Sequence, residues 1–112
     1  MKTDGQHVIC DLWLLESVSQ KEAMRVLNSA VDKNGLNVVG EAFKDFGGES
    51  FTVAYVLSES HLTAHYFPER NYIAIDCFTC GGEGDPLSAV ATVVKELGAN
   101  EAVIKVMQRG VK

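Results

Sequence analysis

The chain has 112 residues, the length of one ordinary domain. Its composition, 46% apolar and 22% charged, is typical of a soluble globular protein and excludes a disordered, collagen-like or low-complexity chain. The net charge of -5 argues against a nucleic-acid partner, because binding a phosphate backbone requires clustered Lys and Arg. No apolar run approaches the ~20 residues of a spanning helix, so no membrane association is expected.

Cysteine usage and the first residues bear on the compartment. The three cysteines, Cys10, Cys77 and Cys80, cannot all pair within one chain. The opening residues 1–7 are polar and lack the apolar segment of a secretory leader. Both features favour a reducing environment, and we expect a cytoplasmic protein.

The first half of the chain predicts a strand, a helix and two further strands. An apolar-rich run at 7–14 is typical of a strand. Ser19-Gln20-Lys21-Glu22 has the pattern of a capping box, and apolar residues at helical spacing follow it until Asn34-Gly35. Gly47-Gly48 predicts a turn between strands at 36–46 and 50–57.

The second half predicts strands at 61–67 and 72–79, a helix between Asp85-Pro86 and Gly98, and a last strand at 101–107. Successive strands joined by short turns pair antiparallel. The expected fold is therefore α+β, a two-layer sandwich of a mainly antiparallel β-sheet with two helices packed on one face, in a single domain over 1–112. The other sheet face needs cover, which a partner subunit could provide.

Two short motifs favour ordinary structural roles. Cys77-Phe78-Thr79-Cys80 is a CxxC, but it ends a predicted strand, where positions i and i+3 point to opposite faces. No second pair of ligands completes a zinc shell, so no metal site is predicted and Cys77 is interpreted as a core residue. The run Gly81, Gly82, Gly84 lacks the ending of a phosphate-binding loop and is interpreted as a flexible turn.

A polar segment between two strands is more informative. Residues 58–65 hold two serines, a glutamate and two histidines, without a Gly or Pro to form an ordinary turn. A hydroxyl with a nearby imidazole, here Ser60 and His65, is the minimum for an activated nucleophile, and Thr52 shares the parity of Ser60. A polar strand edge would explain the same residues, and these arguments alone leave both interpretations open.

The segment 58–69, SESHLTAHYFPE, is followed at 76–81 by DCFTCG. Together they resemble the prokaryotic S-adenosylmethionine decarboxylases, a family of small pyruvoyl-dependent proenzymes. The opening Gly5-x-His7 with Asp11-Leu12, the two helices and the overall length are also similar to that family. The resemblance covers nearly the whole chain, and the joint signature is highly specific.

The resemblance implies that the protein makes its own cofactor. The Ser60 hydroxyl would attack the Glu59 carbonyl and convert the peptide bond into an ester. β-Elimination would then cut the chain between Glu59 and Ser60, giving 1–59 and 60–112. The Ser60 remnant would become a pyruvoyl group that forms a Schiff base with the substrate amine.

Further residues take roles from the same resemblance. His65 matches a processing histidine that transfers protons, and Thr52 stands where a processing hydroxyl is usually serine. Cys80 matches the catalytic proton donor, a role that suits a thiol because its pKa lies near neutrality.

The resemblance also implies a substrate site. Glu69 matches the acid that binds the ribose hydroxyls of the substrate. Phe46 and Phe67 are the candidates for aromatic surfaces against adenine, although Trp or Tyr is commoner where this chain has Phe67.

The expected function is decarboxylation of S-adenosylmethionine for spermidine biosynthesis, by a homodimer of cleaved protomers with active sites near the subunit boundary. One alternative keeps the fold and the pyruvoyl group but decarboxylates L-ornithine or L-arginine, since a few contacts determine a pocket. Another is a processing-dead homologue that regulates an active partner, against which the joint presence of Ser60, His65 and Cys80 argues.

Overall fold

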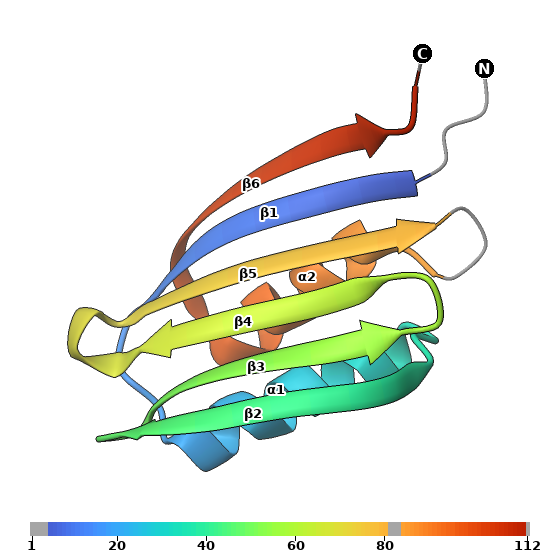
Figure 1. Cartoon of the computed structure of the whole chain (residues 1–112). Coiled ribbons are helices and arrows are strands. Elements are labelled where there is room, and N and C mark those ends of the chain that lie inside the picture. Colours follow the sequence, from blue (N-terminus) through green and yellow to red (C-terminus); the bar gives the residue numbers. More distant parts are fainter. Residues whose placement is uncertain (1–4, 81–83, 112) are drawn as a thin grey trace.

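The computed structural model describes residues 5–80 and 84–111 (Figure 1). Of the glycine run predicted as a flexible turn, Gly81 and Gly82 lie outside the described residues. The elements in chain order are β1 (Gly5–Leu14), α1 (Gln20–Lys33), β2 (Val38–Gly47), β3 (Ser50–Leu57), β4 (His61–Phe67), the short 3-10 helix η1 (Pro68–Arg70), β5 (Tyr72–Cys80), α2 (Pro86–Leu97) and β6 (Ala99–Arg109).

The six strands form one antiparallel sheet in the order β2-β3-β4-β5-β1-β6. Both helices lie on the same face of this sheet (Figure 1). The predicted two-layer α+β sandwich is therefore confirmed. The first strand of the chain is not at an edge, because β1 is inserted between β5 and β6.

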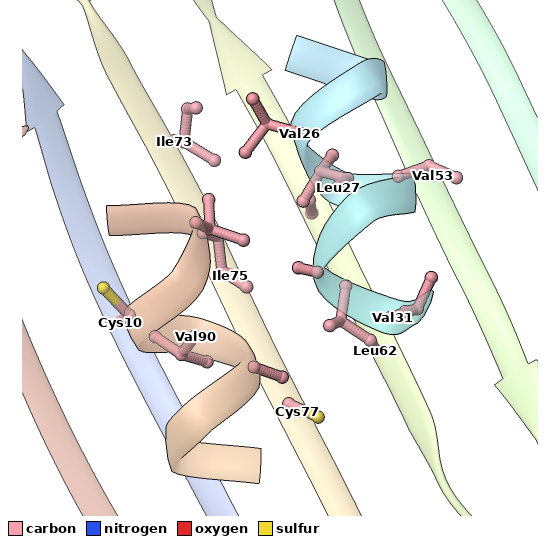
Figure 2. Packing of buried hydrophobic residues seen from close by; sticks show 14 of the residues in the cluster. Cys10, Val26, Leu27, Val31, Val53, Leu62, Ile73, Ile75, Cys77 and Val90 are labelled. Carbon is pink, nitrogen blue, oxygen red and sulfur yellow. The ribbon is translucent and has the colours of Figure 1, made fainter. Parts of the chain in front are cut away.

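The core lies between the helices and one sheet face (Figure 2). Every second residue of the central strands points into it, and α1 contributes the apolar positions predicted from its spacing. For α2 the spacing predicts a face of Leu87, Val90, Ala91, Val94 and Leu97, but only Val90 and Leu97 of these are buried. The helix is turned so that Ala89 and Val93 enter the core in place of Leu87 and Ala91, which are exposed. Cys77 is fully buried in this layer, as predicted, whereas Cys80 on the other face is only partly buried. Burial, with the neighbouring Asp11 carboxylate, raises the pKa of the buried Cys10 thiol to about 11.

One predicted boundary is wrong at residue 36. Leu36 does not begin a strand, because its N–H donates to the carbonyl of Val31 (3.0 Å) while Gly35 N–H donates to Asp32 (3.2 Å). With Gly35 at φ +68°, this pair of bonds is the Schellman ending of α1, and Leu36 packs back onto the core. The last strand also extends further than predicted, over Ala99–Arg109.

The sheet face opposite the helices carries most of the polar residues singled out above. We call it the open face. It also carries large exposed apolar side chains, namely Ile9, Val56, Val103 and Met107. Neither of the helices in the described part of the chain is long and apolar enough to cross a bilayer.

Candidate active site

The turn between β3 and β4 holds the predicted cut site. Leu57 N–H donates to the Ser60 carbonyl at 3.0 Å, which closes the turn, and only 9% of Ser60 is exposed. Cys80, the last residue of β5, contacts both residues of the predicted cut. Its backbone N–H donates to Ser60 Oγ (3.1 Å), and its Sγ–H donates to the Glu59 carbonyl oxygen (3.0 Å).

These two contacts suit an attack of Ser60 on Glu59. The backbone bond fixes the hydroxyl oxygen in place without requiring its proton, because a hydroxyl oxygen accepts as well as donates. The thiol contact directs a donor at the carbonyl oxygen on which negative charge would develop during the attack. Cys80 can therefore act at this peptide bond before any cofactor exists.

Thr52 and His65 form a second pair. They are directly opposite each other on β3 and β4, and Thr52 Oγ1 is hydrogen-bonded to His65 Nδ1 at 2.8 Å. Yet His65 is five residues along β4 from Ser60, which at ~3.3 Å per residue is about 16 Å. A single protomer does not bring this imidazole to the cut site.

The predicted substrate residues lie further away still. Phe46 is near the end of β2, Phe67 is at the end of β4 and Glu69 is in η1. All three lie at the end of the sheet where β2 turns into β3 (left in Figure 1). The β3–β4 turn with Ser60 lies at the opposite end of the strands. The seven residues from Ser60 to Phe67 correspond to about 23 Å of strand.

Aromatic and acidic groups lie at the end of the sheet that holds the β2–β3 turn. The Phe67 ring stacks on Tyr72 with centroids 5.7 Å apart, and the Arg70 guanidinium lies 4.9 Å from the Tyr72 centroid. Glu69 lines a hollow of about 480 Å³ together with Glu49 and residues of the β1–α1 connection. The Phe67–Tyr72 stack offers a surface for a ring, and the carboxylates that line the hollow can accept hydrogen bonds from hydroxyl groups.

A third cluster on the open face received no role from the sequence. Asp76 Oδ2 is 2.8 Å from His7 Nε2 and 3.0 Å from His61 Nε2, and Thr63 donates to the other carboxylate oxygen. Burial would raise the pKa of the Asp76 carboxyl, but the hydrogen bonds from Thr63, His61 and His7 outweigh burial and lower it. Strand parity places all four residues on the face of Cys80, but only the strand order β4-β5-β1 brings them together.

The same cluster is the one group of three metal-ligand side chains found among the described residues, with its ligand atoms within 4.8 Å of one another. However, Arg109 lies 3.0 Å from His7 Nδ1. Since a guanidinium only donates, Nδ1 must be the accepting nitrogen, and the hydrogen on Nε2 faces Asp76. This tautomer supports a hydrogen-bond network and not a set of metal ligands.

The fold, with the SESH and TCG segments joined at the end of β5, defines a small α+β domain of the decarboxylase type. The profile of the family described as S-adenosylmethionine decarboxylase matches residues 6–110. The chain belongs to this family, a family of pyruvoyl-dependent lyases.

Individual relatives agree. The chain is 40% identical to an S-adenosylmethionine decarboxylase proenzyme 2 of Bacillus cereus, over 97% of this chain and 91% of that protein. It is 36% identical to the S-adenosylmethionine decarboxylase proenzyme of Symbiobacterium thermophilum, over 96% and 84% of the two chains. The crystal structure of the adenosylmethionine decarboxylase of Aquifex aeolicus superimposes with a TM-score of 0.89 over 100% of this chain and 95% of that one, at 23% identity, which supports the shared fold.

Proposed function

We propose that this chain is a self-processing decarboxylase that converts S-adenosylmethionine into decarboxylated S-adenosylmethionine and carbon dioxide, the product serving as aminopropyl donor for spermidine. The observation that carries the proposal is the double contact of Cys80 with Ser60 Oγ and the Glu59 carbonyl. It joins three residues of the family signature at one peptide bond. The names of the relatives support the choice of S-adenosylmethionine as the substrate.

The pyruvoyl group would derive from Ser60, and its surroundings fit this origin. The hydroxyl is held next to its own preceding carbonyl, in a turn between two strands, with a thiol beside both. When formed, the group supplies a carbonyl that withdraws electrons as carbon dioxide leaves. Cys80, whose backbone contacts Ser60 Oγ and whose Sγ contacts Glu59, would then lie beside that group and could act as its proton donor.

The sheet topology explains how a cut chain would stay folded. A cut after Glu59 leaves β1, β2 and β3 in one fragment and β4, β5 and β6 in the other. β1 lies between β5 and β6 and pairs with both along its length, while β3 pairs with β4. The two fragments therefore interlock within one sheet, and no linker is needed to hold them together.

A second copy of the chain would complete the site. The predicted catalytic residues Ser60 and Cys80 lie at one end of the sheet. The predicted substrate-binding residues Phe46, Phe67 and Glu69 lie at the other end. In a partner packed against the open face by a two-fold axis, the strands would run in the reverse direction. The end of the partner's sheet that holds Phe67 and Glu69 would then lie against the Ser60 end of this protomer. Burial of the exposed apolar side chains of the open face would favour such a homodimer.

Intact-mass spectrometry tests the processing. The purified chain should appear as two fragments, 1–59 and 60–112, the second without a free amino terminus. A single uncut species of 12.2 kDa would instead favour a processing-dead regulatory homologue. Ser60→Ala is the matched control, and it should give one uncut chain.

A substrate panel tests the chemistry. Release of carbon dioxide is measured with S-adenosylmethionine, L-ornithine and L-arginine on the same processed protein. Turnover of S-adenosylmethionine supports the proposal. Turnover of ornithine or arginine without S-adenosylmethionine would support the alternative substrates and refute the first choice.

Co-expression tests the shared site. His65→Gln alone should process slowly, because the histidine that serves each Ser60 comes from the partner. In a mixed dimer with Ser60→Ala, the His65→Gln chain keeps its own Ser60 and faces an intact His65, so it should be cut. Failure of the mixed dimer to process, with dimers formed, would refute the two-chain site.

A further inference from the structure

His61 is the second residue after the predicted cut, next to Ser60, and is bound to a carboxylate. It is the first residue of β4, and its Nε2 lies 3.0 Å from Asp76 Oδ2. The Asp76 carboxylate is itself held by Thr63 through its other oxygen. Its side chain is 27% exposed, and that of His61 is 41% exposed, so water reaches the imidazole while the carboxylate is largely enclosed.

The hydrogen bonds fix which nitrogen of each ring can take up a proton. An ionised carboxylate only accepts, so both imidazoles present N–H at Nε2 to Asp76. His7 Nδ1 accepts from Arg109 (3.0 Å), and that ring is therefore engaged at both nitrogens. His61 Nδ1 is therefore an accepting nitrogen, and it is the ring nitrogen closer to the backbone of His61, the residue that follows Ser60. Asp76 thus prepares His61 as a base, as a carboxylate does for the histidine of a catalytic triad.

His65 cannot fill this position from the same chain. It lies five residues along β4, about 16 Å from Ser60 by strand rise. Within one protomer, the imidazole nearest to Ser60 along the chain is therefore His61. The two histidines of the SESH segment are available for different stages of processing.

We propose that His61, oriented by Asp76, carries the proton that moves from the Ser60 hydroxyl to the amide nitrogen of residue 60 during ester formation. The inference rests on the proposed self-processing. Asp76 is a positioning residue, since it acts through His61. His65, supplied by the partner, remains for the later elimination.

The step balances without a co-reactant. The Ser60 oxygen attacks the Glu59 carbonyl carbon while its proton passes to His61 Nδ1, directly or through one water. The carbon–nitrogen bond between Glu59 and Ser60 then breaks, and the imidazolium returns the proton to the leaving nitrogen. One amide has become one ester and one amine, Asp76 stays ionised throughout, and His61 ends as it began.

A matched pair of variants tests the inference. His61→Gln and His7→Gln each replace an N–H donor to Asp76 with an amide N–H, but neither amide carries a proton between atoms. We expect His61→Gln to process at least ~100-fold more slowly, the lower end of a general acid–base contribution, and His7→Gln to process much faster than His61→Gln. Equal slowing of both variants would show that the cluster is only a structural anchor and would overturn the proposal.

Hydroxylamine, which cleaves esters but not ordinary amides, separates the two stages. Uncut His61→Gln should resist it, because no ester has formed. Cleavage of this variant at residue 59 by hydroxylamine would place His61 after ester formation and refute the assignment. Added imidazole should accelerate processing of His61→Ala, a response that a lost structural contact does not give.

A mixed dimer locates the histidine within one chain. Co-expressed with Ser60→Ala, the His61→Gln chain should remain uncut, because the His61 that its Ser60 needs belongs to the same chain. Faster cutting of this chain in the mixed dimer than in the His61→Gln homodimer would refute the proposal. A wild-type chain that stays uncut refutes self-processing itself, whereas a cut wild type with an equally fast His61→Gln refutes only the role of His61.

Discussion

Cys80 contacts the predicted cut site through two different atoms, so its proposed roles in processing and in turnover can be tested separately. Cys80→Ala removes the Sγ–H donor at the Glu59 carbonyl (3.0 Å) but keeps the backbone N–H on Ser60 Oγ (3.1 Å). Loss of a strong oxyanion donor costs ~100- to 1000-fold in rate. A thiol is a weak donor, so we expect processing of Cys80→Ala to slow by roughly 10-fold and still reach completion.

Turnover should respond differently. With Sγ gone, the cut enzyme has lost its predicted proton donor, and we expect carbon dioxide release to fall by ~100-fold or more. Cys80→Ser is the matched control. Its hydroxyl can still donate to the Glu59 carbonyl and should restore processing, but it is too weak an acid to restore turnover.

Two measurements on the same preparations check these expectations. Processing is followed by intact mass over time, and carbon dioxide release is normalised to the cut fraction. A wild-type processing rate for Cys80→Ala would show that the Sγ contact does not assist the cut. Normal turnover by fully cut Cys80→Ala would refute the assignment of Cys80 as proton donor.

Three further predictions concern stability. Tyr66→Phe removes two hydrogen bonds with the backbone of Val18 (2.8 and 2.7 Å) and should lower the free energy of unfolding by about 2 kcal/mol in urea denaturation; a change near zero would contradict this. In Gly5→Ala, the new Cβ would lie 2.6 Å from the Thr79 carbonyl oxygen, which should cost ~1–3 kcal/mol in the same assay and slow processing, because Gly5 pairs with Cys80. Because hydrogen bonds lower the pKa of Asp76, its stabilisation is complete above the ordinary carboxyl value of ~3.9 and is lost as the pH falls through the lower folded value. The difference in melting temperature between wild type and Asp76→Asn should therefore shrink below about pH 4, and a constant difference would refute the role of that carboxylate.

Local sequence signals predicted the fold because each element carries its own period and boundary residues. Ser19 is the N-cap of α1 as predicted, with its Oγ accepting from Glu22 N–H at 3.1 Å, but the Glu22 carboxylate binds Arg25. Asp85 caps α2 by accepting from Leu87 N–H. Leu36 was assigned to the wrong element because an apolar residue after a helix-ending glycine fits a strand and a Schellman motif equally well. Only the bond to Val31 distinguishes them.

The site was less predictable because strand parity gives the face of a residue but not its neighbours across the sheet. Asp76 is far from His7 and His61 in sequence, and the order β4-β5-β1 brings the three side chains together. The insertion of β1 between β5 and β6 is a long-range pairing, and no local pattern in residues 5–14 predicts it. A role for Asp76 therefore required the topology.

The opposite limitation applies to Ser60 and His65, which are close in sequence but separated along an extended strand. A helix would place residues five apart within a turn and a half, whereas β4 spreads them over about 16 Å. For a two-fold partner to bring its His65 to this Ser60, the axis must pass near the midpoint of the segment, beside Thr63, whose side chain lies on the open face. The same rotation would move Phe67 and Glu69 of the partner to the end of the sheet that holds Ser60. One symmetry operation would therefore bring both the partner's His65 and its predicted substrate residues to this Ser60. The crowding of SESHLTAH in the sequence is then the consequence of two half-sites on one strand, each completed by the other copy.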